Sequence, residues 1–357
     1  HTGSAWDGGT VVGPMVTNNN DKMLHAIENL EEGESWLVKP EFTDADKYIL
    51  KPSVKWNVKP GSYTFETELF GPVLSVVRIE NLQHGIDLVN GGEYGLTSGL
   101  DSLDESEREL WKNSIEAGNL YINRGITGAI VQRQPFGGMK RSAFGGGIKA
   151  GGPNYVSCFV NFEEKAVFTK TTKPTDTSKG LLSGKELERY AHAVESYCTN
   201  WEKEFAVEHL TQELVGEKNI FRYRPLKNMI FRILPTDSLT DVLMVISASE
   251  ITKTNLTVSI NASDEKAEKL KALGGKFTFV TQSDDEFVKT MTNFERVRVC
   301  SPNIPDSYYL EGAKLGKYIA ITPPLVEGRI ELLHYVKEQS VTYEYHRYGS
   351  FSEEDAK

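Results

Sequence analysis

The sequence has few cysteines and no grouping of side chains that would hold a metal ion. Its three cysteines, Cys158, Cys198 and Cys300, are odd in number and far apart. That pattern favours a reducing compartment over a disulfide framework. No cysteine pair has zinc-ligand spacing, and the seven histidines are scattered. We therefore expect a cytoplasmic protein without a structural or catalytic metal.

Long apolar runs and an excess of basic residues are also missing. No apolar run approaches the roughly 18 residues needed to cross a membrane, and the first residues lack the basic and apolar regions of a secretory signal. A formal net charge of −10 is unfavourable for a surface that binds phosphates. We expect a globular protein with neither a transmembrane segment nor a nucleic-acid partner.

Patterns typical of strands and helices alternate in two parts of the chain. In residues 1–163, short apolar runs such as 71–79 alternate with amphipathic stretches such as 105–118. From residue 228 the alternation resumes, with strand and helix candidates following one another to residue 322. This order predicts an α/β fold with mostly parallel sheets, and a Rossmann-like doubly wound arrangement in the second part.

A stretch rich in Thr, Lys and Pro separates the two parts. Residues 164–183 read as a linker, which predicts domains at 1–163 and 184–357. A helix is predicted to begin at Ser183, where "SGKE" matches a capping box. On its apolar stripe Cys198, or Tyr197 in its place, is expected to lie in the core.

The second part lacks glycine where a dinucleotide would need it. Its first strand-to-helix turn, residues 234–241, reads "LPTDSLTD". Dinucleotide binding needs glycine there, because the backbone must approach the pyrophosphate at the helix N-terminus. We therefore expect a cofactor-type fold without a cofactor. Cys300, at a strand end, has no neighbouring feature that would activate it, and a structural role is expected.

Glycine is abundant in one segment only. Residues 124–155 contain nine glycines among 32 residues. A flexible linker is one reading, but the glycines alternate with Arg, Phe, Lys, Gln and Pro, which make contacts. Long loops inside a compact domain are often functional, so we predict an ordered functional loop.

These segments resemble a known family. "ETELFGPVL" (66–74), "YGLTSGL" (94–100) and the stretch 123–155, where "TGAIV" is followed by "RQPFGG", are similar to the C-terminal half of the aldehyde dehydrogenase catalytic domain. The last stretch most resembles the L-glutamate γ-semialdehyde (Δ1-pyrroline-5-carboxylate) dehydrogenases, particularly those within bifunctional proline utilization A. "NIFRYRP" (219–225) and "HRYG" (346–349) resemble the C-terminal extension of the longer bifunctional enzymes, an aldehyde-dehydrogenase-like domain without catalytic duty.

The resemblance implies a site for NAD. Glu68 matches the glutamate that accepts hydrogen bonds from the ribose hydroxyls beside the nicotinamide, a task that suits a carboxylate facing a vicinal diol. Phe70 matches an aromatic neighbour of the same end of the cofactor, and Leu96 an apolar contact nearby. Simple core packing is the alternative role for Phe70 and Leu96.

The resemblance also implies a substrate site. Gly128 and Ala129 match a loop whose backbone N–H groups anchor the substrate α-carboxylate, where small residues allow the backbone to approach an anion. Phe136 matches the aromatic wall along the methylene chain, and Asn123 a polar residue near the pocket.

Two arginines of the same loop are also candidates for carboxylate binding. For Arg124 and Arg133 we instead expect structural or surface ion pairs, because most arginine charges are solvated or paired.

The family's catalytic cysteine has no counterpart here. It lies upstream of the motif around Glu68, and none of the 67 preceding residues is Cys; the NAD-binding domain has no counterpart either. We therefore expect a fragment of an NAD-dependent dehydrogenase that oxidises L-glutamate γ-semialdehyde in proline catabolism, inactive by itself. The parent enzyme is expected to be a homodimer joined through edge strands near 156–163. The sequence leaves open an FAD-containing proline dehydrogenase half.

Two other readings compete with this one. The first is an aldehyde dehydrogenase for an uncharged or longer aldehyde, which the carboxylate-anchoring loop disfavours. The second is a non-catalytic scaffold or interaction module, which would have no need of Glu68 or of the loop.

Overall fold

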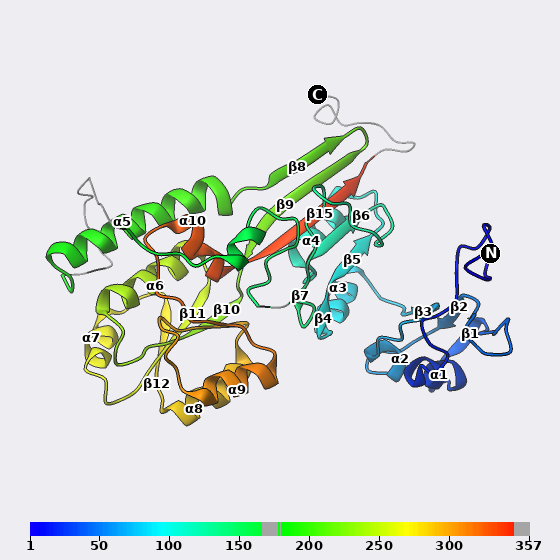
Figure 1. The fold of residues 1–357 in the computed structure, drawn as a ribbon, viewed down its shortest axis with the longest axis horizontal. Helices are drawn as coiled ribbons and strands as arrows, with labels where there is room; N and C mark the ends of the chain where they lie inside the picture. The colour runs from blue at the N-terminus through cyan, green and yellow to red at the C-terminus, as the bar shows by residue number, and fades with distance from the viewer. Residues whose placement is uncertain (144, 166–177, 179, 346–357) are drawn as a thin grey trace. The chain divides into compact units, whose positions relative to one another are not determined.

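The computed structural model describes residues 1–143, 145–165, 178 and 180–345 (Figure 1). It contains two compact units, residues 1–92 and 93–357. The "HRYG" motif at 346–349 and most of the predicted linker lie outside the described residues. The domain boundaries at 163 and 183 stay a prediction. Within the described residues, no helix is long and apolar enough to cross a bilayer.

The first unit contains a small three-stranded sheet. β2 pairs antiparallel with β1 and parallel with β3. The elements are α1 (Asp21–Glu28), β1 (Ser35–Val38), β2 (Ser53–Trp56), α2 (Tyr63–Glu66), β3 (Val73–Val76) and α3 (Leu82–Gly91). The side chain of Asn20 caps α1, and Met23 and Ala26 of this helix form a small core with Leu50 and Leu69.

The second unit contains the predicted doubly wound sheet. Its five strands are all parallel, in the order β12-β11-β10-β13-β14, which is the mononucleotide-binding order with β10 first. The elements are β10 (Asn228–Arg232), α6 (Leu239–Thr252), β11 (Asn255–Ile260), α7 (Lys266–Leu273), β12 (Phe277–Thr281), α8 (Asp284–Thr290), β13 (Arg296–Arg298), α9 (Asp306–Leu315) and β14 (Ile319–Ala320). The α/β fold class is confirmed.

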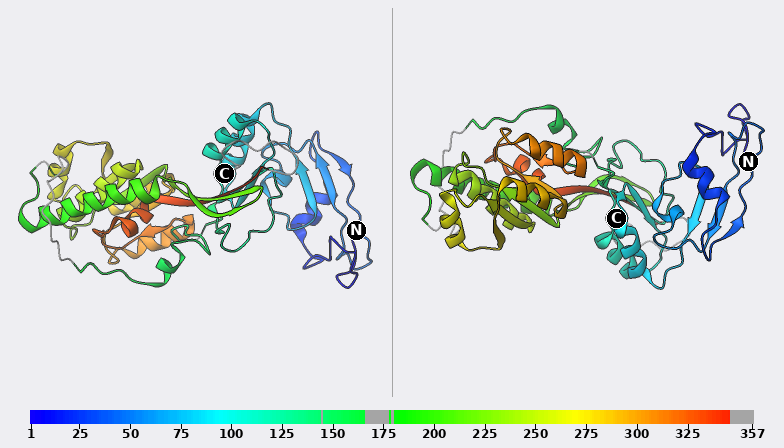
Figure 2. Two further views of the ribbon diagram at one scale, coloured as in Figure 1. Left: turned by 90° about the horizontal axis from the view of Figure 1, so that it is seen from above. Right: turned by 90° about the horizontal axis from the view of Figure 1, so that it is seen from below.

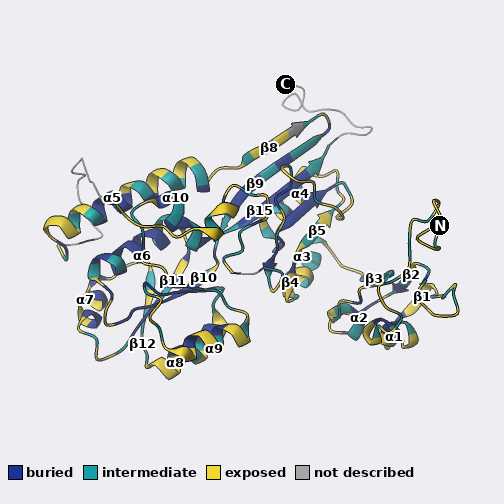
Figure 3. Cartoon of the chain, in the orientation of Figure 1, coloured by how far each residue is buried: buried dark blue, intermediate teal, exposed yellow. Residues whose placement is uncertain are grey.

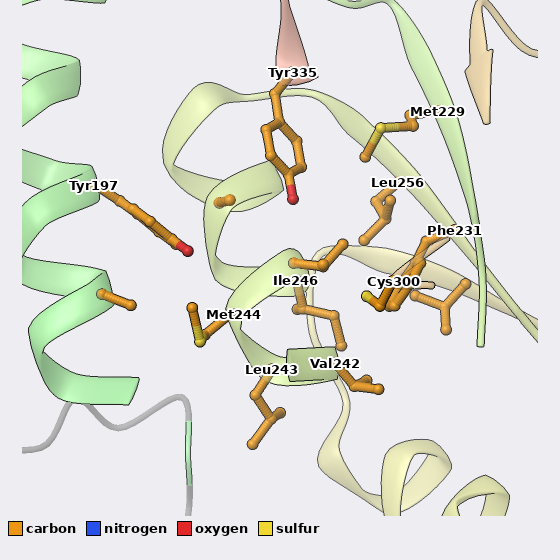
Figure 4. Packing of buried hydrophobic residues seen from close by; sticks show 14 of the residues in the cluster. Tyr197, Met229, Phe231, Val242, Leu243, Met244, Ile246, Leu256, Cys300 and Tyr335 are labelled. Carbon is orange, nitrogen blue, oxygen red and sulfur yellow. The ribbon is translucent and has the colours of Figure 1, made fainter. Parts of the chain in front are cut away.

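Both faces of this sheet are covered (Figure 3). Met229 and Phe231 of β10 pack with α6 and α7, whereas Ile230, which points to the other face, packs with α8 and α9. Helix α6 is buried on all sides, since α5 (Gly184–Asn200) packs on its outer face. Cys300 is buried in the same cluster (Figure 4), and its burial raises the pKa of its thiol. Its predicted structural role is thus supported.

The capping box predicted for α5 is wrong, and of the two residues predicted for its core position Tyr197 is confirmed and Cys198 is wrong. Ser183 is the N-cap residue, but its side chain accepts no capping hydrogen bond, so the capping box does not form. Cys198 is exposed. The helix turns by about 100° per residue, and it is Tyr197 that points inward, with its hydroxyl donating to the Leu325 carbonyl at 2.6 Å.

A second sheet of this unit was not predicted. It has the order β5-β6-β15-β9-β8 and combines strands that are distant in the sequence (Figure 2). The elements are β5 (Thr97–Leu100), α4 (Glu105–Ser114), β6 (Asn119–Ile122), β8 (His209–Leu214), β9 (Glu217–Pro225) and β15 (Val336–Glu344). β15 pairs parallel with β6 and antiparallel with β9. The sheet therefore unites both sides of the predicted linker.

The expected edge strand near 156–163 is wrong, because no strand is present in these residues. Residues Tyr155–Phe159 form a 3-10 helix instead. The reason is local: the N–H and hydroxyl of Ser157 both donate to the Asn154 carbonyl, which turns the chain.

A buried ion pair ties the doubly wound sheet to the segment before β15. Arg298 and Glu331 are fully buried with 3.1 Å between Nη2 and Oε1. We predict that Glu331→Gln lowers the free energy of unfolding by about 3–5 kcal/mol, because it leaves a buried guanidinium uncompensated. Urea unfolding of the 357-residue chain would measure it.

The control is Glu93→Gln, which breaks the exposed Arg141–Glu93 pair and should leave the unfolding midpoint unchanged. Equal effects of the two substitutions would contradict the prediction.

Candidate functional site

Glu68 and Phe70 lie in the first unit, in the segment after α2. The residue between them, Leu69, is buried, and its carbonyl accepts a hydrogen bond from Asn20 at 2.7 Å. Glu68 is exposed, and among the described residues its carboxylate has no hydrogen-bond partner. Phe70 is 79% exposed and has a φ of +52°, which is rare for an aromatic residue.

Leu96, the third expected cofactor contact, lies in the second unit. It follows β4 (Tyr94–Gly95), its side chain is 40% exposed, and its carbonyl accepts the Asn119 N–H at 2.9 Å. Neither Leu96 nor Phe70 is therefore a core residue of its own unit.

The loop 124–155 begins at a constrained turn after β6. Asn123 has a φ of +58°, a conformation that asparagine tolerates better than most residues. Its Oδ1 accepts the Ser102 N–H at 2.8 Å. The structure thus gives Asn123 a role in shaping the start of the loop.

Gly128 and Ala129 present their backbone to solvent. Gly128 has a φ of +78° and open space on the side where a Cβ would lie. Among the described residues, the N–H groups of Gly128 and Ala129 have no hydrogen-bond acceptor. Consecutive unpaired N–H groups at a turn with positive φ are suited to binding an anion.

Phe136 lies on the opposite stretch of the same loop. Its N–H and carbonyl both pair with Ala150, at 2.9 Å each, and its side chain is 37% exposed. The ring therefore lies at the surface on a fixed backbone.

The two loop arginines form ion pairs, as predicted. Arg124 approaches Glu217 at 3.2 Å and Glu344 at 3.7 Å, and Arg133 lies 4.0 Å from Glu217. Both guanidinium groups are thus directed to Glu217 of β9, and that of Arg124 also to Glu344 of β15.

The middle of the loop is held by Asn119, a fully buried residue of β6. Its Nδ2 donates to the Pro135 carbonyl at 3.1 Å, and its Oδ1 accepts from the Gly137 N–H at 3.2 Å and from Lys149 Nζ at 2.8 Å. Lys149 Nζ also donates to the Gly137 carbonyl.

The end of the loop is held by Glu338 of β15. This buried carboxylate accepts the Lys149 N–H and the Asn154 side-chain amide, each at 2.7 Å. Burial raises the pKa of Glu338, and it lowers the pKa of Lys149 to about 7, against the opposing effect of the Glu338 charge.

Three residues that hold the loop were not predicted from the sequence: Asn119, Lys149 and Glu338. Each is polar and buried, and the pattern of β15, "VKEQSVTYE", has no apolar alternation that would have indicated a buried strand. The one available signal was the frequency of contact-making side chains within 124–155.

The residues described above lie mostly within the part of the chain that is similar to known proteins. Residues 1–164 match the model of the aldehyde dehydrogenase family. A 1-pyrroline-5-carboxylate dehydrogenase of Geobacillus kaustophilus is 36% identical over 148 residues, 41% of this chain and 28% of that protein. One of Bacillus subtilis is 34% identical over 155 residues, 43% of this chain and 30% of that protein. The chain thus spans less than a third of these relatives.

A solved structure extends the similarity beyond residue 164. Proline utilization A from Corynebacterium freiburgense matches with a TM-score of 0.79 and 35% sequence identity, over 96% of this chain and 32% of that one. The resemblance seen in the sequence is confirmed.

The lowered pKa of Lys149 should make the free energy of unfolding depend on pH. Between pH 7 and 10.5 the unfolded chain keeps this proton and the folded chain does not. The free energy of unfolding should therefore rise with pH across that window, by at most about 1.4 kcal/mol per unit. Lys149→Met should flatten this slope.

Urea unfolding of both proteins at pH 7, 8 and 9 would measure the two slopes. Because the substitution also removes two hydrogen bonds, the slope and not the absolute stability is the test. Parallel slopes would contradict the prediction.

Proposed function

We propose that this chain is the C-terminal part of an NAD-dependent dehydrogenase that oxidises L-glutamate γ-semialdehyde to glutamate in proline catabolism. The observation that carries the proposal is the turn at Gly128 and Ala129, whose N–H groups have no hydrogen-bond acceptor within the described part of the chain. The 1-pyrroline-5-carboxylate dehydrogenases of Geobacillus kaustophilus and Bacillus subtilis and the proline utilization A structure support the same assignment.

At the substrate end, the two N–H groups would bind the α-carboxylate, and the exposed ring of Phe136 would cover the methylene chain. A carboxylate bound by backbone N–H groups forms charge-assisted hydrogen bonds. This arrangement selects an aldehyde that carries a carboxylate over an uncharged one, whose carbon chain would leave the N–H groups unpaired.

At the cofactor end, the residues fit NAD. The Glu68 carboxylate is exposed and has no partner among the described residues, so it is free to accept from the ribose diol. The exposed ring of Phe70 offers an apolar surface beside it. When bound, NAD accepts the hydride in a net reaction that converts aldehyde and water to carboxylate.

The nucleophilic thiol of this reaction is proposed to lie upstream of residue 1. Among the cysteines of this chain, Cys158 and Cys198 have pKa values raised by burial, the opposite of an activated thiolate, and Cys300 is buried in the core. The chain alone is therefore proposed to be inactive.

The doubly wound part is proposed to be structural and to hold no dinucleotide. Its first turn is filled by its own groups: the Asp237 carboxylate accepts the Leu234 N–H at 2.8 Å, and burial raises its pKa to about 6. Ser238 caps α6 and bonds the Asp241 carboxylate at 2.7 Å. Carboxylates at this helix N-terminus would repel the negative charge of a pyrophosphate and occupy the place where it would bind.

The parent enzyme is proposed to be a cytoplasmic homodimer. All three cysteines carry free thiols, in keeping with a reducing compartment. Val156 and Phe159, within the expected contact region, are 72% and 71% exposed. If the parent enzyme is bifunctional, its other half would be a proline dehydrogenase that contains FAD.

The purified 357-residue chain should produce no NADH from L-glutamate γ-semialdehyde and NAD, because it lacks the nucleophile. The same assay with the longer protein, including the residues upstream of His1, should show NADH formation at 340 nm. Turnover by the short chain that a thiol reagent abolishes would refute the proposed inactivity. A longer protein without activity would favour the scaffold reading.

Glu68→Ala in the longer protein should raise the KM for NAD about tenfold or more, since a carboxylate that accepts from a diol is lost, and leave the KM for the aldehyde unchanged. Steady-state kinetics would measure both constants. Glu66→Ala, which removes another exposed carboxylate two residues away, is the matched control. Equal effects of both substitutions would contradict the role of Glu68.

A further inference from the structure

A series of buried hydrogen bonds connects the turn at Gly128 and Ala129 to the hairpin of β8 and β9. The Ile130 N–H donates to Gln134 Oε1 at 3.0 Å, and Gln134 Nε2 donates to Asn219 Oδ1 at 3.2 Å. The same Asn219 oxygen accepts from Thr342 Oγ1 of β15 at 3.1 Å. Gln134, Asn219 and Thr342 are each at most 2% exposed.

The contacts of Asn219 determine which atoms donate and which accept in this series of hydrogen bonds. Asn219 Nδ2 donates to Glu217 Oε1 at 2.8 Å and to the Gln212 carbonyl at 3.4 Å, so its Oδ1 faces Gln134. The Gln134 amide must then present nitrogen to Asn219 and oxygen to Ile130. A reversed amide would place two donors or two acceptors against each other in a buried site, which is costly.

The turn is attached to the hairpin at a second point. The Ile130 carbonyl accepts from the N–H groups of Arg133 and Gln134, at 3.1 and 3.0 Å, and the Arg133 carbonyl accepts from Thr211 Oγ1 at 2.7 Å. The hairpin thus holds this segment at Arg133 and Gln134, and Gln134 in turn holds Ile130.

We propose that Gln134 and Asn219 are positioning residues for the carboxylate-binding N–H groups of Gly128 and Ala129. The Ile130 N–H belongs to the peptide plane that follows Ala129, so holding that plane fixes the C-terminal end of the turn and restricts the orientations open to the two preceding N–H groups. This inference rests on the proposed function. It assigns part of the selectivity for a carboxylate-bearing aldehyde to a residue of β9, 85 positions beyond Gln134.

The test uses the longer enzyme, with its upstream residues, and two substrates: L-glutamate γ-semialdehyde and propanal, which has no carboxylate. Gln134→Met and Asn219→Ala should each raise the KM for the semialdehyde about tenfold, the equivalent of one charge-assisted hydrogen bond. kcat for the semialdehyde, and kcat/KM for propanal, should stay within about twofold.

Gln339→Met is the matched control. Gln339 is also a fully buried amide, bonded to Arg222 and to the Ala117 carbonyl at 2.9 Å each, and these partners lie outside the loop 124–155. It should lower the melting temperature by a similar amount without raising the KM for the semialdehyde.

The double variant Gln134→Met/Asn219→Ala should be no worse than the more impaired single variant, because both residues act through one chain of bonds. If either variant fails to fold, Thr342→Val, which removes only the hydroxyl donor, should give a smaller KM shift in the same direction.

Equal losses toward both aldehydes, additive effects in the double variant, or a matching KM rise in Gln339→Met would overturn the positioning role. A wild-type enzyme that does not oxidise the semialdehyde would instead refute the proposed function itself.

Discussion

The parallel pairing of β15 with β6 is the interaction on which the rest of the second unit depends. It sets Ser340 opposite Asn119 and connects segments as far apart as Gln339 and Ala117, 222 positions in the sequence. β6 leads directly into the loop 124–155, and β15 lies between β6 and the β8–β9 hairpin. Most of the buried side chains that hold the loop from outside belong to these neighbours, and Arg296 of β13 adds a hydrogen bond to the Gly146 carbonyl at 2.8 Å.

The chemistry of β15 explains why this pairing is specific. Glu338, Gln339, Ser340 and Thr342 are all buried, and burying such groups without partners is costly. Each finds its partner in an earlier segment: Ser340 donates to the Pro135 carbonyl at 2.6 Å, for example. A register shift of one residue would leave several of these groups unpaired, so strand and loop specify each other.

The local patterns of the sequence were sufficient for the doubly wound sheet and not for the mixed one. In strands such as Asn255–Ile260 apolar and polar residues alternate, and helix candidates flank the strand. This pattern is visible in one short window. β15 is polar and buried, because its partners are supplied by distant residues, and no window contains both. The same limit applies to the site: Gly128 was found through a motif, whereas Asn219 acts on the loop only through the folded hairpin. At Cys198 the error was one position, which on a helix is enough to exchange the inner face for the outer.

The distance in sequence between the loop and Glu338 has a consequence for biosynthesis. The ribosome adds about 5–20 residues per second, and Glu338 lies 189 positions after Lys149. The nascent loop therefore waits on the order of ten seconds or longer before the strand that shapes it exists. During that interval only the partners from β6, β8 and β9 are available, and a polypeptide that ends before β15 would lack the Glu338 carboxylate to which Lys149 and Asn154 bond at the end of the loop.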